Sequence, residues 1–253
     1  MTQASVGWHC PDCTQRHRKQ AAPAHKMVRV ALHGHRPVVT QLMIAASVAV
    51  FAWDGVQGAN LMTGSGSIAA RDLSLFAPLV ERGEWYRVVT SAFTHSGLIH
   101  LGFNMWLLWI IGQALEGRFG SLTFATLYAT GILGGALGAV LVEPKASVVG
   151  ASGAVFALMG VTLVLQRMGG MGVFQGGIGG LVLINVLLSF RSGISLGGHL
   201  GGLAAGLVSG WLLGEARRRG RRYEALAPIA ISAVGLVCLI GLMPAIDRAV
   251  SQF

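Results

Sequence analysis

The chain has 253 residues, of which 53% are hydrophobic and only 11% are charged. About a quarter of the residues of a soluble domain carry a charge, so an ordinary soluble domain is excluded. The net charge of +9 would suit a nucleic-acid partner, but the basic residues flank apolar runs instead of gathering on one folded face. Flanking Lys and Arg residues fix membrane topology and contact anionic lipid, so nucleic acid is excluded as a partner.

The apolar runs predict an all-α fold, a polytopic membrane helical bundle. A bilayer-spanning helix needs about 20 mainly apolar residues. Seven runs are candidates, the fourth and fifth being short: 38–56, 97–115, 121–142, 152–167, 174–190, 194–214 and 226–246. The first 37 residues lack the apolar core of a signal peptide, so we expect the first run to act as an uncleaved signal anchor.

Lys and Arg residues are divided unequally between the two sides of such a bundle. Thirteen of the 19 fall on the side of the N-terminal tail and six on the other side. Cytosolic loops carry the excess of positive charge. We therefore expect a multi-pass plasma-membrane protein with its N-terminus in the cytosol, its C-terminus outside, and the loop 57–96 outside.

Residues 1–37 read as a basic cytosolic tail. Cys10 and Cys13 form a Cys-x-x-Cys pair, with His9 and His17 nearby. Zinc takes four N or S ligands in a tetrahedron, and this pair supplies half of them. Three interpretations stay open: a tail without fixed structure, a zinc site completed by a histidine or a second chain, and thiol redox chemistry.

The connections also carry signals. In the loop 57–96, apolar residues between positions 73 and 80 precede Trp85 and Tyr86, which favour the membrane interface. We expect a short helix there, lying on the outer leaflet. Residues 217–224 read as a polar cytosolic linker to the seventh run. Four glycines in the first half of run 174–190 weaken that helix and suggest a lateral gate, although close packing explains them as well.

Small residues recur in two of the runs at a spacing of three or four. They are Gly198, Gly202, Gly206 and Gly210 in the sixth run, and Gly153, Ala157 and Gly160 in the fourth. Small residues at this spacing let helix backbones approach closely in lipid. We therefore expect these two runs to pack together, which would bring Ser152 close to His199.

Polar residues inside a membrane are costly and call for a reason. Ser152 opens the fourth run between Gly150 and Gly153, at a helix start whose free N–H groups can stabilise an oxyanion. His199 lies near the outer end of the sixth run and is a candidate base for the serine. On the second run, His100 and Asn104 are four residues apart and share one helix face.

A catalytic triad would need an acid to orient the histidine. None of the ten Asp and Glu residues lies on the outer side of the second, fourth, fifth or sixth run. A Ser152–His199 dyad remains, and another group must hold the imidazole. Phe156 lies one turn after Ser152 and is expected to stack against His199, unless it is simply a core residue.

Together these residues resemble the rhomboid family of intramembrane serine proteases. The active-serine helix of that family is similar to Gly150-Ala151-Ser152-Gly153 with Phe156 to Gly160, and its histidine helix is similar to Gly198-His199 with Gly202 and Gly206. Three further motifs match: His95, His100 and Asn104 in the second span, Trp85-Tyr86-Arg87 in the first outer loop, and Glu116-Gly117-Arg118 after the second span.

The resemblance covers about residues 71–210 and implies a bacterial rhomboid with a six-span catalytic core (38–214), followed by a linker and an extra seventh span (215–253). It implies that Ser152 is the nucleophile and His199 the base. His100, Asn104 and the Ser152 amide would form the oxyanion hole, with Gly150, Gly153 and Phe156 in support, and His95 would be structural. The tail resembles the second half of a zinc ribbon that precedes the membrane domain in some relatives.

The expected activity is cleavage of single-span membrane proteins within the bilayer, with no cofactor and no metal beyond the candidate ligands Cys10 and Cys13. Two alternatives remain. A catalytically inactive rhomboid relative would bind membrane clients, but such proteins usually lack the serine or the histidine. A small transporter would also carry intramembrane histidines and glycine-rich helices, but the chain has no internal repeat and no acidic residue suited to ion coupling.

Overall fold

The computed structural model describes residues 2–3, 8–9, 36–191 and 193–252. The chain divides into two compact units, Met1–Arg36 and Pro37–Phe253. In the first unit, β1 (Thr2–Gln3) pairs with β2 (Trp8–His9) in antiparallel register. Cys10, Cys13 and His17 lie outside the described residues, so the interpretations of the tail remain predictions.

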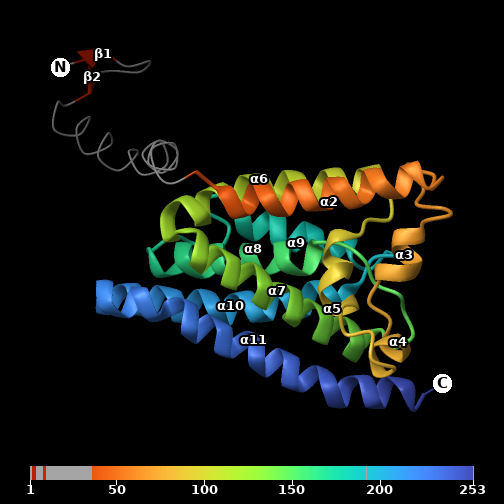
Figure 1. Ribbon diagram of the computed structural model, residues 1–253. Coiled ribbons are helices and arrows are strands. Elements are labelled where there is room, and N and C mark those ends of the chain that lie inside the picture. Colours follow the sequence, from red (N-terminus) through yellow and green to blue (C-terminus); the bar gives the residue numbers. More distant parts are fainter. Residues whose placement is uncertain (1, 4–7, 10–35, 192, 253) are drawn as a thin grey trace. The chain divides into compact units, whose positions relative to one another are not determined.

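The second unit is a bundle of helices that run back and forth along one direction (Figure 1). Their bounds are α2 (Val38–Val56), α6 (Leu98–Phe119), α7 (Ser121–Val142), α8 (Ser152–Met168), α9 (Ile178–Leu188), α10 (Leu196–Arg219) and α11 (Arg221–Val250). In the described part of the chain, five of these are long and apolar enough to cross a membrane, while α8 and α9 are shorter apolar helices. The predicted all-α membrane bundle is confirmed, with one helix in each of the seven apolar runs.

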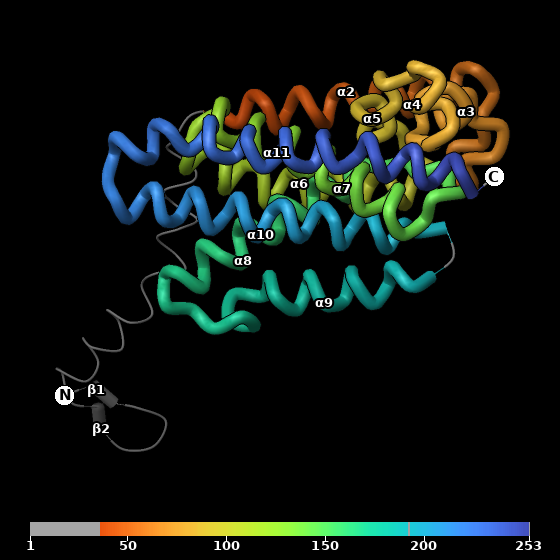
Figure 2. The backbone as a smooth tube through the Cα atoms, turned by 90° about the horizontal axis from the view of Figure 1, so that it is seen from below, coloured from red at the N-terminus to blue at the C-terminus, as the bar shows by residue number. Residues whose placement is uncertain are grey.

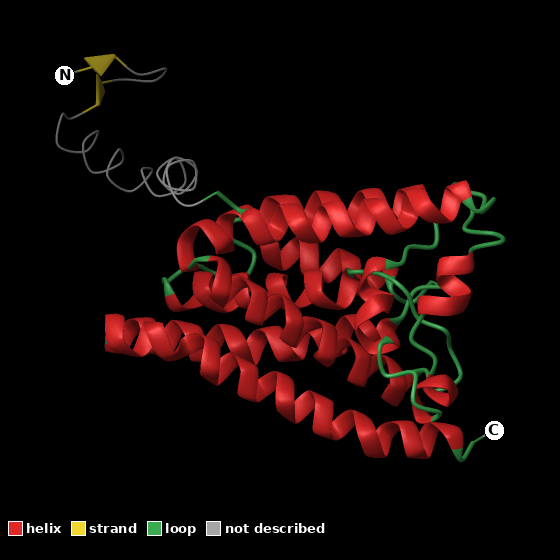
Figure 3. Ribbon diagram, in the orientation of Figure 1, coloured by secondary structure: helices red, strands yellow, loops and turns green. Residues whose placement is uncertain are grey.

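Short elements and loops gather at one end of this bundle, which we call the loop end (Figure 3). It contains α3 (Ile68–Leu73), α4 (Ala77–Glu81), α5 (Arg87–Thr90) and the 3₁₀ turn η1 (Ser91–Phe93). The sequence predicted one short helix in the loop 57–96, and the structure has three. Arg87 holds this loop together from a buried position, because its guanidinium donates to the backbone carbonyls of Arg71 and Ser74, at 3.1 Å each, and to the Glu84 carboxylate at 2.7 Å.

Several helix boundaries differ from the prediction. The sequence predicts a polar linker at residues 217–224, and this prediction is wrong, because α10 continues to Arg219 and α11 begins at Arg221. Arg, Glu, Ala and Leu are strong helix formers, and Gly220, with φ +108°, makes the turn alone because glycine tolerates that conformation. Helix α9 begins only at Ile178, so most of the glycine-rich half of run 174–190 is a turn.

The expected close packing of the fourth and sixth runs is confirmed. A Cβ atom added to Gly202 would lie 2.0 Å from the Gly153 carbonyl oxygen, and one added to Gly206 would lie 2.1 Å from that of Ala157. Helix α7 joins them through a glycine stripe that the sequence reading overlooked. A Cβ at its Gly138 would lie 2.2 Å from the Gly197 carbonyl oxygen. Three helices therefore meet through their backbones, as small residues allow in lipid.

Helix α9 lies at the edge of the bundle, beside α8 and α10 (Figure 2). Apart from Gly179, its buried residues are Ile178, Val182 and Asn185, followed by Ser189 at its C-terminal end. Their spacing of four, three and four residues places them on one helix face. The opposite face exposes large apolar residues, as a lipid-facing surface does. We call the buried face of α9, continued by Ser189, its inner stripe. This stripe becomes polar toward the loop end.

Candidate active site

Ser152 is the first residue of α8, and the segment before it is held by the loop end. Leu75 and Val148 exchange two backbone hydrogen bonds of 2.9 Å, and the Gly150 N–H donates to the Ser91 carbonyl at 2.9 Å. Gly150 has φ +121°, in the region that favours glycine. The chain therefore turns sharply just before the serine, which is presented at a helix N-terminus with free backbone N–H groups.

His100 lies on the other side of Gly150. A Cβ atom added to Gly150 would be 2.7 Å from His100 Cε1, 2.8 Å from His100 Nε2 and 3.7 Å from Ser152 Oγ. The absence of a side chain at position 150 is thus what allows the imidazole to approach the serine. Glycine at position 150 therefore serves twice: it permits the turn before Ser152 and it leaves room for the His100 ring.

The hydrogen bonds of His100 define which of its nitrogens carries the proton. The Ser96 backbone N–H donates to His100 Nδ1 at 3.5 Å, and Ser96 Oγ lies 3.0 Å from the same nitrogen. A nitrogen that accepts from an N–H has no proton in a neutral imidazole, so the proton is assigned to Nε2. His100 therefore presents an N–H donor on the side that faces Gly150 and Ser152.

His95 and Asn104 complete this side of the site. The His95 Nδ1–H donates to the Phe93 carbonyl at 3.3 Å, and its Nε2 accepts from the Ala151 N–H at 3.5 Å. Burial lowers the pKa of His95 to about 3, helped by nearby His100, so His95 is a neutral structural support. Asn104 is buried, and its amide Nδ2 donates to the His100 carbonyl at 2.9 Å, leaving one of its two N–H groups for another acceptor.

His199 lies one turn into α10 and is buried. Its ring stacks on that of Phe156, with centroids 4.2 Å apart and an interplanar angle of 17°, so the structure contains the contact that the spacing predicted. The other constraint is Ser189, whose Oγ lies 2.5 Å from His199 Nδ1. The imidazole is therefore held by a ring from α8 and a hydroxyl from the end of α9.

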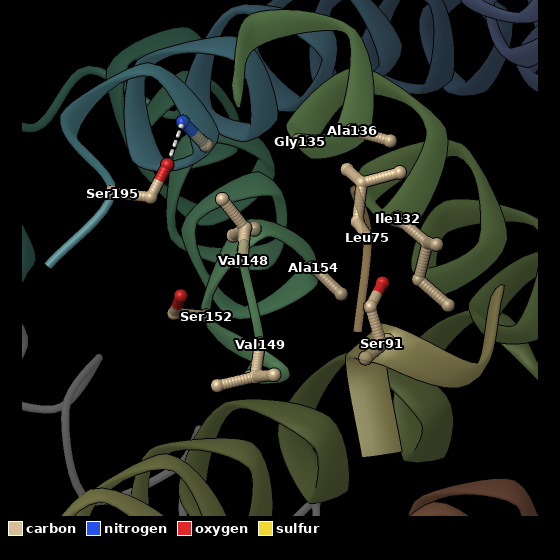
Figure 4. A pocket seen from close by; sticks show the side chains of 14 residues that line it. Leu75, Ser91, Ile132, Gly135, Ala136, Val148, Val149, Ser152, Ala154 and Ser195 are labelled. Atoms are coloured by element: carbon tan, nitrogen blue, oxygen red, sulfur yellow. Dashed lines mark hydrogen bonds between the residues drawn. The ribbon is translucent and has the colours of Figure 1, made fainter. Parts of the chain in front are cut away.

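The start of α10 is capped twice. Ser195 Oγ accepts from the Gly198 N–H at 3.0 Å, which is the dashed line in Figure 4. The Glu143 carboxylate accepts from the Leu196 N–H at 2.8 Å, the Gly197 N–H at 3.3 Å and the Ser195 hydroxyl. Because a carboxylate favours the positive end of a helix, Glu143 ties the end of α7 to the turn that carries His199.

Ser152 and His199 come from helices in backbone contact, but they are not hydrogen-bonded: Ser152 Oγ has no partner among the described residues. Apo active sites often show long catalytic contacts that tighten on substrate binding. A cavity beside Ser152 has about 30 Å³ of room for water, enough for about two molecules. Figure 4 shows it between Val148, Ala154, Ile132 and Ser91.

The sequence analysis missed four residues of this arrangement: Ser96, Glu143, Ser189 and Ser195. Ser195 with Gly198 has the spacing of a helix cap, and that signal would have marked the start of α10. The acidic residue that satisfies this cap lies more than 50 residues earlier, and no local pattern connects the two. Among the described residues, no group of three or more His, Cys, Asp or Glu side chains could hold a metal ion.

The helical bundle, with its apolar helices and buried polar end, defines a polytopic membrane protein. The rhomboid domain matches residues 82–216, more than half of the chain. The chain belongs to the rhomboid family.

Individual relatives agree with this. The rhomboid protease GluP of Bacillus subtilis (strain 168) is 29% identical over 162 residues, which are 64% of this chain and 31% of that protein. RHOMBOID-like protein 5 of Arabidopsis thaliana is 38% identical over 107 residues, 41% of this chain and 35% of that protein. Rhomboid-related protein 3 of Homo sapiens is 35% identical over 82 residues, 32% of this chain and 20% of that protein. The chain thus spans about a third or less of these relatives.

Proposed function

We propose that the protein is an intramembrane serine endopeptidase that cuts membrane proteins by a Ser152–His199 dyad. The observation that carries the proposal is the meeting of two helices through their glycine faces. This meeting brings a serine at a helix N-terminus and a histidine held by Phe156 to the same end of the bundle. Relatives that are named proteases support the same reaction class.

In the proposed reaction, His199 Nε2 takes the Ser152 hydroxyl proton while Oγ attacks the scissile carbonyl carbon. The carbonyl oxygen becomes an oxyanion, which accepts from the Ser152 N–H, the His100 Nε2–H and the free Asn104 amide N–H. The proton on His199 passes to the leaving amine, and the carbon–nitrogen bond breaks. A water molecule then gives a proton to His199 while its oxygen attacks the carbonyl carbon of the acyl-serine. The bond between that carbon and Ser152 Oγ breaks, His199 returns the proton to Oγ, and the carboxylic acid leaves. The cavity beside Ser152 has room for that water.

The proposal includes an orientation. Most of the basic residues lie in the last turns of α6, α8 and α10, at the ends away from the loop end, or at the start of α11, or precede α2 in the sequence. By the positive-inside rule, the N-terminus is cytosolic and the loop end with Ser152 faces outside. The membrane we propose is the plasma membrane. The substrates are single-span membrane proteins that reach the site from the lipid.

A fluorophosphonate probe and a membrane-embedded substrate in liposomes test the proposal together. The wild-type protein should label and cleave. Ser152→Ala should do neither, and His199→Ala should lose cleavage, because members of such a unit each cost on the order of a million-fold in turnover. Folding of each variant is checked by thermal unfolding in detergent. Cleavage that survives in a folded Ser152→Ala protein would sink the dyad, and a wild-type protein with neither label nor cleavage would favour a client-binding relative.

A further inference from the structure

Ser189 occupies a position that the proposed chemistry has not yet used. It is the residue that follows α9, it is 3% exposed, and it continues the buried face of that helix. Its Oγ has two close partners. The hydroxyl donates to the Asn185 carbonyl at 2.7 Å, and Oγ lies 2.5 Å from His199 Nδ1.

The two contacts together fix the direction of the second one. A serine hydroxyl has a single proton, and a backbone carbonyl can only accept. Once the Ser189 proton is given to Asn185, Oγ faces His199 with lone pairs alone. The short contact is therefore a hydrogen bond from the His199 Nδ1–H to Ser189 Oγ, and Nε2 of the neutral ring carries the free lone pair.

We propose that Ser189 is the positioning residue of the catalytic base: it holds His199 in the tautomer whose Nε2 can accept the Ser152 proton. The inference rests on the proposed role of His199 and supplies the partner that the missing acid would have provided. The bond also suits the reaction, because Nδ1–H donates to Oγ both before and after Nε2 is protonated. Ser189 can therefore hold the ring through the whole cycle without changing its own protonation.

The His100 imidazole provides an internal contrast. It also has a serine oxygen near Nδ1, but there the Ser96 backbone N–H donates to the same nitrogen. The proton is consequently assigned to Nε2 in His100 and to Nδ1 in His199. The two rings at the loop end thus carry opposite tautomers. Each tautomer suits the role proposed for its ring, because His100 donates to an oxyanion and His199 accepts a proton.

The attachment of Ser189 to α9 gives the bond a second consequence. Helix α9 lies at the edge of the bundle, and the polar end of its inner stripe meets His199. Any displacement of this end of α9 removes the acceptor from Nδ1. The orientation of the base is therefore coupled to the position of α9 beside α8 and α10.

The test uses the full-length protein in liposomes with three variants. Ser189→Ala removes the acceptor, Ser189→Thr keeps a hydroxyl, and Ser209→Ala is the matched control. Ser209 is another buried serine of the described chain, on α10, whose Oγ has no hydrogen-bond partner. Loss of the orienting acid in a triad costs about ten-thousand-fold in turnover. A neutral acceptor is weaker, so for Ser189→Ala we expect a loss of roughly ten- to a hundred-fold in kcat with KM unchanged.

A spectroscopic readout separates tautomer control from simple packing. With ¹⁵N-labelled histidine, His199 should show a protonated Nδ1 and an unprotonated Nε2 in wild type, Ser209→Ala and Ser189→Thr. In Ser189→Ala the proton should move in part to Nε2. Wild-type kcat in Ser189→Ala, a fall in kcat with an unchanged tautomer, or a rise in KM alone would each overturn the inference.

The same experiment distinguishes a failure of the role proposed for Ser189 from a failure of the proposed protease function. Ser152→Ala and His199→Ala are measured in parallel. If both are inactive while Ser189→Ala is indistinguishable from wild type in turnover and tautomer, the dyad stands and the role of Ser189 falls. If folded Ser152→Ala or His199→Ala still cleaves, the dyad itself falls.

Discussion

Substitution of Gly202 by alanine should separate α8 from α10, the helices that carry the proposed dyad. The added Cβ atom would lie 2.0 Å from the Gly153 carbonyl oxygen, whereas ordinary contacts begin at 3.4 Å. The helices must therefore move apart by about 1.4 Å at this point, because the obstacle is backbone and cannot rotate away. Misplacement of reacting groups by about 1 Å can cost a hundred-fold in rate, and overpacking typically costs about 1–3 kcal/mol of stability.

The matched control is Gly102→Ala, because a Cβ atom at this exposed helical position would meet nothing within 4 Å. Cleavage of a membrane-embedded substrate and thermal unfolding are measured for both variants. We expect Gly202→Ala to lose about a hundred-fold in kcat and to unfold at a lower temperature, while Gly102→Ala resembles wild type. A Gly202→Ala protein with wild-type turnover would show that the close approach of α8 and α10 does not set the geometry of the site.

Three further predictions concern the oxyanion donors, the start of α10 and the loop 57–96. Replacing His100 or Asn104 by alanine should lower kcat about a hundred- to a thousand-fold, as loss of an oxyanion donor does; a change in KM alone would contradict that role. Glu143→Ala leaves N–H groups at the start of α10 without an acceptor and should cost about 1–2 kcal/mol of stability, measured by chemical unfolding, with Glu143→Gln less damaging. The Tyr86 hydroxyl, followed by Arg87, lowers the pKa of Glu84 from its ordinary 4.5. This contribution to stability is present above that pH and is lost as pH falls through the folded-state value, so Glu84→Gln should flatten the decline of Tm below pH 4.5.

The sequence predicted the parts of this protein that depend on composition and spacing. Apolar runs predicted the helices because a bilayer requires a fixed length of apolar chain. Glycine spacing predicted the contact of α8 with α10, since only small residues allow it. The start of α9 and the helical character of residues 217–219 and 221–224 were missed, because glycine content and charge say little about where a helix begins or ends.

The support for the imidazoles could not be read from sequence in the same way. Nothing in the sequence distinguishes Ser96 and Ser189 from other serines. Their effect on each imidazole depends on which neighbouring groups donate and accept hydrogen bonds. That depends on the backbone carbonyl or N–H that the fold places beside each one. The expectation that some group other than an acid must hold His199 was sound, but naming Phe156 alone identified only the stacking partner.

Three carboxylates of this fold lie at helix N-termini and not beside His199. Glu116, which is fully buried, accepts from the Val39 and Thr40 N–H groups at the start of α2. Asp54 accepts from the Ala69 N–H at the start of α3, and Glu143 caps α10. Each of these three carboxylates lies at a helix N-terminus, where the dipole and free N–H groups favour it and, for Glu116 and Asp54, offset the cost of burial.

His199 Nδ1 faces the opposite kind of surface, the C-terminal end of α9, where carbonyl groups carry partial negative charge. A carboxylate placed there would be repelled by the helix end and would have no N–H groups to satisfy it, in a region where buried charge is already costly. In the proposed proton transfer a positive charge would develop on His199, and the same helix end would favour it. A hydroxyl that donates to its own helix and accepts from the imidazole suits both requirements, which is why a serine, and not an aspartate, fits the third position of this site.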